Sequence, residues 1–282
     1  MNILTFDIED WFHILDNPLT KYDHQWENFE SRLHRNMDLI FGLLDSQNQK
    51  ATFFCLGWVG EKYPDIIRKI SDLGHEIGSH TNRHQLIYEQ TKDEFSEDLK
   101  SSINTLEGIT GKKVVSFRAP GFSIRSENLW ALEVLIEQGI EYDSSIFPAP
   151  RSHGGINLDG YSEPFLINHD GCTLKEFPIN VYSFFSFPIV YSGGGYFRLF
   201  PSKIIDGFFA NASYVMTYFH PRDFDPGQPL APGLSMFRKF KSYYGLDSTF
   251  PKLKRLMESN HFMPLSSSTG LVDWDSAKTL SI

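Results

Sequence analysis

The clearest chemical signal in the sequence is a pair of histidines, His80 and His84, four positions apart. On one helical turn, side chains at i and i+4 face the same way, so two imidazoles at this spacing can share a divalent cation such as Zn²⁺. A catalytic metal centre with two imidazoles needs a third ligand, usually a carboxylate, and keeps one position for water. The pair therefore predicts part of a divalent-metal site.

Three carboxylates, Asp7, Glu9 and Asp10, lie within four residues at the end of the first apolar segment. Like charges this close repel one another, and a bound cation would relieve that repulsion. Alternation along a strand places Asp7 and Glu9 on one face, which favours Glu9 as the third ligand. If the chain curls at the strand end, Asp10 reaches the metal instead. Both remain candidates, and an acid outside the metal shell is free to act as a base.

Two more residues follow apolar segments. Arg118 comes directly after Val114–Phe117, where it could pair with a carboxylate and hold it ionised and oriented. His220 comes directly after Tyr214–Phe219, and it becomes a candidate general acid if the fold brings it opposite Asp7.

The elements that must position these residues alternate through the first half of the chain. Helical periodicity covers 27–44, 63–73 and 94–109, and Thr91-Lys-Asp-Glu94 is a capping box. Strand patterns cover Ile3–Ile8, Ala51–Leu56, His75–Ser79, Val114–Phe117 and Tyr142–Ser144. This rhythm predicts an α/β fold with a parallel sheet, either doubly wound or a barrel. In a parallel barrel, the edge at the strand ends is the active face.

The second half of the sequence lacks the regular alternation of strands and helices seen in the first half. Residues 148–159 form a Pro/Gly loop; strands are expected at 174–181, 190–191 and 214–219, helices at 202–212, 237–244 and 250–259, and a last strand at 262–266. Neither a repeat nor a linker is visible, so we expect one domain over residues 1–282.

Composition limits the function classes. A net charge of −9 and a pI near 5.6 leave no electrostatic footprint for nucleic acid. The sequence has no run of 18 apolar residues, so it predicts no membrane span. Its first residues lack the basic and apolar regions of a signal peptide. The two cysteines, Cys55 and Cys172, have neither metal nor redox spacing, so we expect a cytoplasmic protein. Aromatic residues make up 15% of the chain, which indicates a large core or a groove that stacks on sugars.

The motifs in this order resemble the polysaccharide deacetylase family, carbohydrate esterase family four, over most of residues 1–220. The similar segments are Thr5-Phe-Asp7, His75-Glu-Ile-Gly-Ser-His80-Thr-Asn-Arg-His84, Arg118-Ala-Pro120, Tyr142-Asp143-Ser-Ser and Phe219-His220. A bacterial subgroup linked to exopolysaccharide loci is most similar in Asp7-Ile-Glu-Asp-Trp11, Gly193-Gly-Gly-Tyr-Phe-Arg198 and His220-Pro221. The resemblance implies a distorted (β/α) barrel of about seven strands.

The resemblance also implies an activity, namely a metal-dependent hydrolase that removes N-acetyl groups from a sugar in a polysaccharide or its biosynthetic intermediate. The implied metal ligands are His80, His84 and either Glu9 or Asp10, with zinc as the expected cation. Asp7 is implied as the base, His220 as the general acid, and Arg118 as the residue that orients Asp7.

Further roles are expected on the same basis. Asp143 would tune His220, and the Gly121 N–H would contribute to the oxyanion hole. The candidate sugar-stacking residues are Trp11, Tyr196 and Phe197.

Two departures from the family pattern keep alternatives open. The usual adjacent Asp-Asp pair is Asp7-Ile8 here, and Gly121 stands where an aromatic residue is common. One alternative is a metal-independent hydrolase of a small cyclic amide or ureide on the same fold, and another is an inactive carbohydrate-binding protein. The retained His80 and His84 favour the metal enzyme, whereas the identity of the sugar and the oligomeric state stay open.

Overall fold

The structure is a computed structural model that describes residues 1–15, 17–149, 153–156, 158, 160–184 and 187–282. Its strands are short: β1 (Asn2–Ile3), β2 (Thr5–Ile8), β3 (Thr52–Cys55), β4 (Glu76–Ser79), β5 (Ser116–Phe117), β6 (Tyr142–Asp143), β7 (Phe165–His169), β8 (Cys172–Glu176), β9 (Tyr182–Phe184), β10 (Phe187–Ile189), β11 (Val215–Met216) and β12 (Thr279–Ser281).

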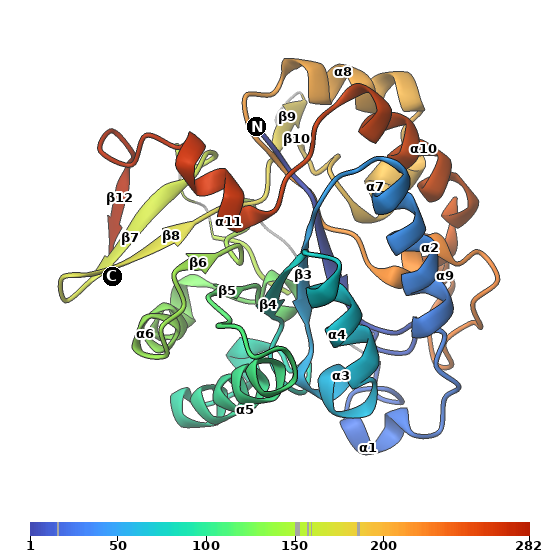
Figure 1. Ribbon diagram of the computed structural model, residues 1–282, viewed down its shortest axis with the longest axis horizontal. Coiled ribbons are helices and arrows are strands. Elements are labelled where there is room, and N and C mark those ends of the chain that lie inside the picture. Colours follow the sequence, from blue (N-terminus) through green and yellow to red (C-terminus); the bar gives the residue numbers. More distant parts are fainter. Residues whose placement is uncertain (16, 150–152, 157, 159, 185–186) are drawn as a thin grey trace.

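The helices lie mostly around the outside of the strands (Figure 1). They are α1 (Asp23–Trp26), α2 (Leu33–Ser46), α3 (Gly57–Lys62), α4 (Pro64–Asp72), α5 (Lys92–Thr110), α6 (Trp130–Glu137), α7 (Gly194–Leu199), α8 (Ser202–Asn211), α9 (Met236–Tyr243), α10 (Leu246–Ser259) and α11 (Leu265–Ser268), with 3₁₀ turns η1 (Ile87–Glu89), η2 (Pro120–Phe122), η3 (Ser126–Asn128), η4 (Pro221–Phe224) and η5 (Thr269–Leu271).

One sheet organises the molecule. Its order is β12-β7-β8-β6-β5-β4-β3-β2, and β2 to β6 are parallel neighbours. The hairpin β7–β8 is antiparallel, and β8 adds to β6 in parallel. This arrangement confirms an α/β fold with a mostly parallel, distorted barrel.

The first strands are paired on both sides. β1 pairs in parallel with β11, and a bridge joins Phe6 to Phe219. The Asp7 N–H donates to the Phe219 carbonyl at 2.8 Å, while β3 lies on the other side of β2. The ends of β2 and of the 215–219 segment therefore meet at one edge. Asp7, near the end of β2, and His220, directly after Phe219, both lie there.

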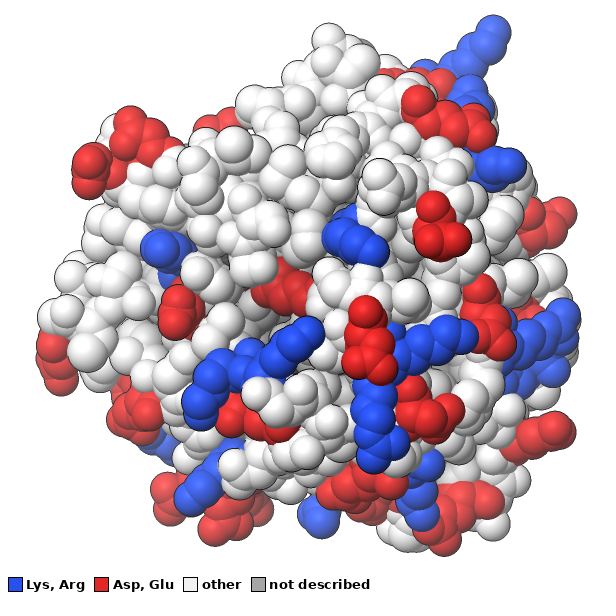
Figure 2. Space-filling view, viewed as in Figure 1, with Lys and Arg blue, Asp and Glu red and all other residues white. Residues whose placement is uncertain are grey.

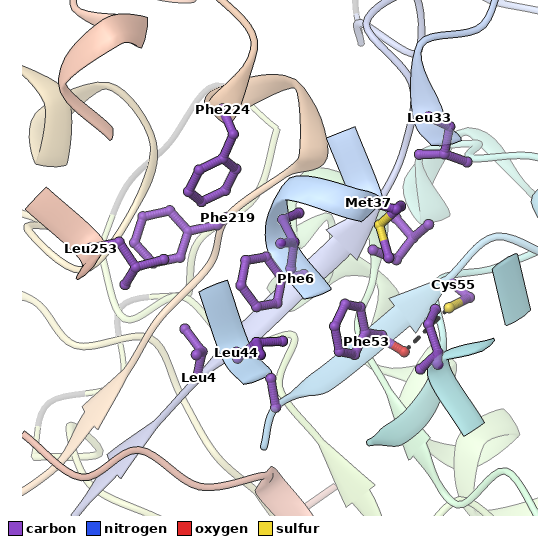
Figure 3. Packing of buried hydrophobic residues seen from close by; sticks show 14 of the residues in the cluster. Leu4, Phe6, Leu33, Met37, Leu44, Phe53, Cys55, Phe219, Phe224 and Leu253 are labelled. Carbon is purple, nitrogen blue, oxygen red and sulfur yellow. Dashed lines mark hydrogen bonds between the residues drawn. The ribbon is translucent and has the colours of Figure 1, made fainter. Parts of the chain in front are cut away.

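A core of aromatic side chains supports that edge from inside. The Phe6 ring stacks on Phe53 with centroids 5.2 Å apart and lies 6.2 Å from Phe219 and 6.1 Å from Phe224 (Figure 3). Because side chains alternate along a strand, Phe6 points away from Asp7. Burial of each such ring stabilises the fold by roughly 1.5–3 kcal/mol, so the base is anchored through its neighbour.

Local sequence signals explain several boundaries. The capping box at Thr91 and Glu94 starts α5, and Gly111 ends it with φ 66°. The helix expected from residue 27 begins at Leu33, after the Ser31 hydroxyl and the Arg32 N–H donate to the Asp10 carboxylate. The strand expected at 262–266 was wrong: Met263 makes one bridge with Ile3, and α11 follows Pro264.

The surface carries both signs of charge. On the face seen in Figure 2, acidic and basic side chains are interspersed, without a broad field of one sign. In the described ranges, no helix is both long and apolar enough to span a bilayer.

Candidate metal centre and active site

Glu9, His80 and His84 converge just beyond the ends of β2 and β4. Their ligand atoms all lie within 4.8 Å of one another, and all three side chains are buried. Glu9 Oε1 is 3.1 Å from His80 Nε2 and 2.9 Å from His84 Nε2. Zinc bonds of 2.0–2.1 Å at a tetrahedral angle place ligand atoms about 3.3 Å apart, close to this spacing.

The contacts of the two histidines leave a ring nitrogen of each available to a cation. His80 Nδ1–H donates to the Arg118 carbonyl at 2.7 Å, which leaves a lone pair on Nε2 facing Glu9. His84 Nε2 is also buried and faces Glu9 Oε1 at 2.9 Å. Burial raises the pKa of Glu9. The positive charges of His84 and His220 and the hydrogen bonds from His80 and His84 outweigh this effect and hold the pKa of Glu9 well below its usual range. An anionic carboxylate and two ring nitrogens are the donor set that a divalent metal prefers.

The histidines lie on a loop and not on the expected helical turn. Thr81 and His84 have φ values of 70° and 53°, in the left-handed region that non-glycine residues rarely adopt. The loop is held from outside, because the Asp98 carboxylate on α5 accepts the N–H groups of Asn82 and Arg83. Burial raises the pKa of Asp98 to about 6. Positioning of both imidazoles therefore depends on tertiary contacts.

Asp10 does not belong to this group, which corrects the second alternative for the carboxylate ligand. Its carboxylate accepts hydrogen bonds from Ser31 Oγ at 2.5 Å and from the N–H groups of Trp11 and Arg32. Those contacts hold the start of α2, so Asp10 serves the fold while Glu9 faces the imidazoles.

Asp7 lies beside the triad and is held by Arg118. Arg118 Nη1 donates to Asp7 Oδ1 at 2.8 Å and to Thr5 Oγ1 at 2.6 Å. Its other nitrogens donate to the Ser144 hydroxyl and carbonyl, and its guanidinium lies 4.4 Å from the Phe54 ring centroid. Both side chains are almost fully buried. The ion pair fixes Oδ1 and leaves Oδ2 facing His220.

His220 closes the opposite side of the site. Its Nε2 is 3.8 Å from Asp7 Oδ2 and 3.9 Å from Glu9 Oε1, and its side chain is 24% exposed. Nδ1–H donates to Asp223 Oδ2 at 3.0 Å, and Asp223 in turn pairs with Arg198. Burial lowers the pKa of His220, but Glu9, Asp223 and Asp7 outweigh it and raise that pKa to about 9.

The partner of His220 is therefore Asp223 and not Asp143, which corrects that expectation. Asp143 Oδ1 accepts the Ser145 hydroxyl at 2.5 Å, and the Asp143 carboxyl interacts with that of the buried Glu176. Burial and Asp143 together raise the pKa of Glu176 well above its usual range. The signal for Asp223 was available, since the acid stands three residues after His220 and Pro221 sets the first position of a helical turn.

Two of the expected sugar-stacking residues are structural. Trp11 is 4% exposed and donates its Nε1–H to the Glu30 carbonyl, and Phe197 is fully buried against Phe219. Tyr196 is 45% exposed and stacks on Phe200, so it stays a candidate. Gly121 has φ 60°, and a Cβ there would approach Leu15 Cδ1 to 2.7 Å. Its proposed oxyanion contact stays a prediction.

Sequence reasoning missed one further neighbour of the site, His13. Its Nδ1 accepts the Asp10 N–H, its ring lies 6.1 Å from that of His84, and its Nε2 is buried without a partner. Burial lowers the pKa of His13 well below its usual range, so the ring is neutral and Nε2 carries the proton.

Two family models match successive parts of this chain. Residues 19–141 match the family model described as polysaccharide deacetylase, and residues 144–269 match one described as a domain of unknown function, DUF3473. A chitooligosaccharide deacetylase from Azorhizobium caulinodans is 31% identical over 141 residues, which span 48% of this chain and 67% of that protein. The chain belongs to the polysaccharide deacetylase family. The subgroup linked to exopolysaccharide loci is the one in which the second model is found.

Other members of the family match shorter stretches. A peptidoglycan-N-acetylglucosamine deacetylase from Bacillus cereus is 34% identical over 95 residues, and the match spans 33% of this chain and about a third (34%) of that protein. Among solved structures, one described as a polysaccharide deacetylase from Mycobacterium smegmatis has a TM-score of 0.67 at 18% identity, covering 99% of this chain and 92% of that one.

The fold alone does not decide activity within this family. A family 4 pseudoenzyme from Bacillus anthracis aligns with a TM-score of 0.51 at 12% identity, covering 100% of this chain and 69% of that one. Activity therefore depends on the residues of the site as well as on the fold.

Proposed function

We propose that this polysaccharide deacetylase family member is a divalent-metal-dependent hydrolase that removes N-acetyl groups from a sugar in a polysaccharide or its biosynthetic intermediate. One observation carries the proposal: Glu9 Oε1 lies within 3.1 Å of two imidazole nitrogens and 3.9 Å from His220 Nε2, which is itself 3.8 Å from Asp7. The proposed metal ligands, the proposed base Asp7 and the proposed acid His220 therefore lie next to one another.

The proposed cation is zinc, held by Glu9, His80 and His84. A metal bound there would polarise the acetamide carbonyl and lower the pKa of a bound water. The mixed carboxylate and imidazole set is typical of catalytic zinc sites with an open fourth position.

The chain itself supplies the proton transfers. Asp7 is oriented by Arg118 and accepts the proton of the attacking water through Oδ2. His220 donates its Nε2 proton to the departing amine, because an unprotonated amine anion is a very poor leaving group. Asp223 accepts from Nδ1, which keeps the proton of Nε2 directed into the site. The Gly121 N–H is the proposed second donor to the developing oxyanion.

The substrate class follows from the relatives, which are named as deacetylases of peptidoglycan and chitooligosaccharide. Tyr196 is the remaining candidate for stacking on a sugar ring. We propose an N-acetylated saccharide as substrate.

The test is acetate release from N-acetylated chitooligosaccharides by the purified chain, before and after chelation and after reloading with Zn²⁺. We expect release that follows metal content, measured by elemental analysis of the same samples. Undiminished release from metal-free protein would overturn the metal-dependent mechanism. Metal-loaded protein that releases no acetate from any N-acetylated sugar would overturn the activity.

A further inference from the structure

Helix α9 (Met236–Tyr243) is attached to the molecule with its apolar side outward. Met236 is 81% exposed, Phe237 70% and Phe240 53%, and no residue of the helix is buried. The charged residues Arg238 and Lys239 are less exposed than these apolar ones. A surface helix of a globular protein normally shows the opposite arrangement.

The pattern is regular along the helix. At 100° per residue, Met236, Phe237, Phe240 and the following Tyr244 fall on one stripe. Arg238 and Lys239 fall on the other side, and Lys241 lies at the edge of the stripe beside Phe237. Tyr244 is 49% exposed, and the nearby Leu230 is 62% exposed. We call these five side chains the α9 apolar face.

Polar contacts hold the helix in this orientation. The Arg238 side chain donates to the Leu15 carbonyl at 2.5 Å, and the Tyr243 hydroxyl accepts the Ala231 N–H at 2.7 Å. Arg198 donates to the carbonyls of Lys241 and Tyr244. Hydrogen bonds therefore fix the inner side, and the outer side is not needed for the fold.

Charge separates this segment from the rest of an acidic protein. The chain has a net charge of −9, yet residues 226–246 contain no acid and three cations, Arg238, Lys239 and Lys241. Lys241 Nζ lies 5.5 Å from the Phe237 ring centroid, so positive charge flanks the apolar face directly. Figure 1 shows α9 at the periphery of the molecule.

We propose that α9 docks the protein on the surface of an anionic lipid bilayer. A helix with Phe and Met on one face and Lys and Arg on the other is typical of helices that lie in the bilayer interface. A sugar polymer fits less well, because Met236 and Leu230 offer no flat ring for stacking. A second copy of the chain fits less well too, because a two-fold contact would bring the same cations together.

The docking surface is connected to the proposed active site. Arg198, which holds the last carbonyls of α9, also pairs with Asp223, the partner of His220. A bilayer under α9 would therefore lie next to the acid side of the site. Docking itself does not rest on the proposed hydrolase activity.

The test is flotation of the full chain with vesicles of phosphatidylcholine alone or with phosphatidylglycerol added. We expect binding that needs the anionic lipid and weakens as salt rises. Phe237→Asp with Phe240→Asp should lower binding at least tenfold, and Lys241→Gln by about five-fold, the effect of about one cation near such a surface.

A matched control is Leu271→Asp, because Leu271 is 63% exposed on η5 and lies outside α9. It should float as the parent chain does. Each variant is checked for unchanged melting temperature and for unchanged acetate release from a soluble chitooligosaccharide.

Three results would overturn the proposal. One is equal flotation of the parent chain and the double variant, and another is no flotation of the parent chain with anionic vesicles. The third is a raised KM of the double variant for soluble oligosaccharide with no change in flotation, which would assign the apolar face to the glycan. Absence of acetate release from the metal-loaded parent chain, with its flotation intact, would count against the hydrolase and leave docking standing.

Discussion

The two sides of the site are held in place by different means. On the metal side, Glu9 and His80 directly follow parallel strands of one sheet, and the Asp98 carboxylate on α5 holds the backbone of the loop that carries His84. On the acid side, His220 depends on a relay of side chains, from Asp223 to Arg198 to the carbonyls at the end of α9. The metal side should therefore respond to loss of a ligand, and the acid side should respond to distant changes in charge.

The largest effect is expected on the metal side. Glu9→Gln or His80→Ala should weaken metal affinity by more than about 100-fold, the upper range for residues that only support a ligand. Acetate release should fall with the metal content, while the circular dichroism spectrum stays unchanged. Asp10→Asn is the matched control, because Asp10 faces α2 and not the imidazoles. Equal metal loss in Asp10→Asn and Glu9→Gln would mean that the assigned ligand is wrong.

The proton-transfer residues come next. Asp7→Asn and His220→Ala should each lower kcat by roughly 10²–10⁴-fold on an acetamide substrate, the usual range for a positioned base or acid. On an activated ester, whose leaving group needs no proton, His220→Ala should cost much less and Asp7→Asn about the same. An equal loss on both substrates for His220→Ala would remove its assignment as the acid.

A smaller, directional effect tests the relay. His220 must be protonated to donate, so its titration sets the alkaline limb of the kcat profile. Against the effect of burial, Glu9, Asp223 and Asp7 raise its pKa to about 9 in the metal-free chain, and the limb of the loaded enzyme should lie below that pH. Asp223 is one of the charges that raise this pKa, so Asp223→Asn should move the limb to lower pH by roughly 1–3 units. A cation on Glu9 acts in the same direction, because it offsets the charge that raises the pKa most.

The control for this variant is Asp225→Asn. Asp225 lies two residues further along but pairs with Arg32, not with His220. Its profile should keep the alkaline limb of the parent chain, and a shift as large as that of Asp223→Asn would show that general surface charge, not the relay, sets the limb.

The smallest effect concerns the buried pair Asp143 and Glu176. The pKa of Glu176 is raised, so ionisation costs stability as the pH rises above the ordinary range of a glutamate. Glu176→Gln should remove this contribution, so the melting temperature of the variant should fall less steeply than that of the parent chain as the pH rises. Glu176→Ala should instead lower the melting temperature at every pH, because the Ile146 N–H loses its acceptor. A decline in Glu176→Gln as steep as that of the parent chain would show that Glu176 is not a source of the pH dependence.

The sequence made the metal side easier to predict than the acid side. His80, Glu9 and Arg118 each follow a short strand, and the strand ends of a parallel sheet meet at one edge, so the pattern of strands placed them correctly. Strand alternation also favoured Glu9, which is the acid that faces the imidazoles.

Contacts between side chains that lie far apart in the sequence are harder to predict from it. Arg198 and Asp223 are 25 residues apart and meet only through the packing of α7 against the turn after His220. Trp11 and Phe197 were expected at the surface because aromatic residues suit both sugars and cores, and only the three-dimensional packing separates the two uses. The inverted exposure of α9 was likewise hidden, since an amphipathic period does not say which face turns inward.

The pairing of the first strand has a consequence for folding kinetics. The Thr5 N–H and hydroxyl donate to the hydroxyl and carbonyl of Thr217 across a sequence separation of 212 residues, and the Leu4 N–H donates to the carbonyl of Met263. Contacts of such long range close late, because loop entropy must be overcome before they form. During synthesis, Asp7 can meet His220 only after the more than two hundred residues between them have been made. We therefore expect nascent chains to hold the metal ligands together before they can catalyse, and activity to arise only in the final folding step.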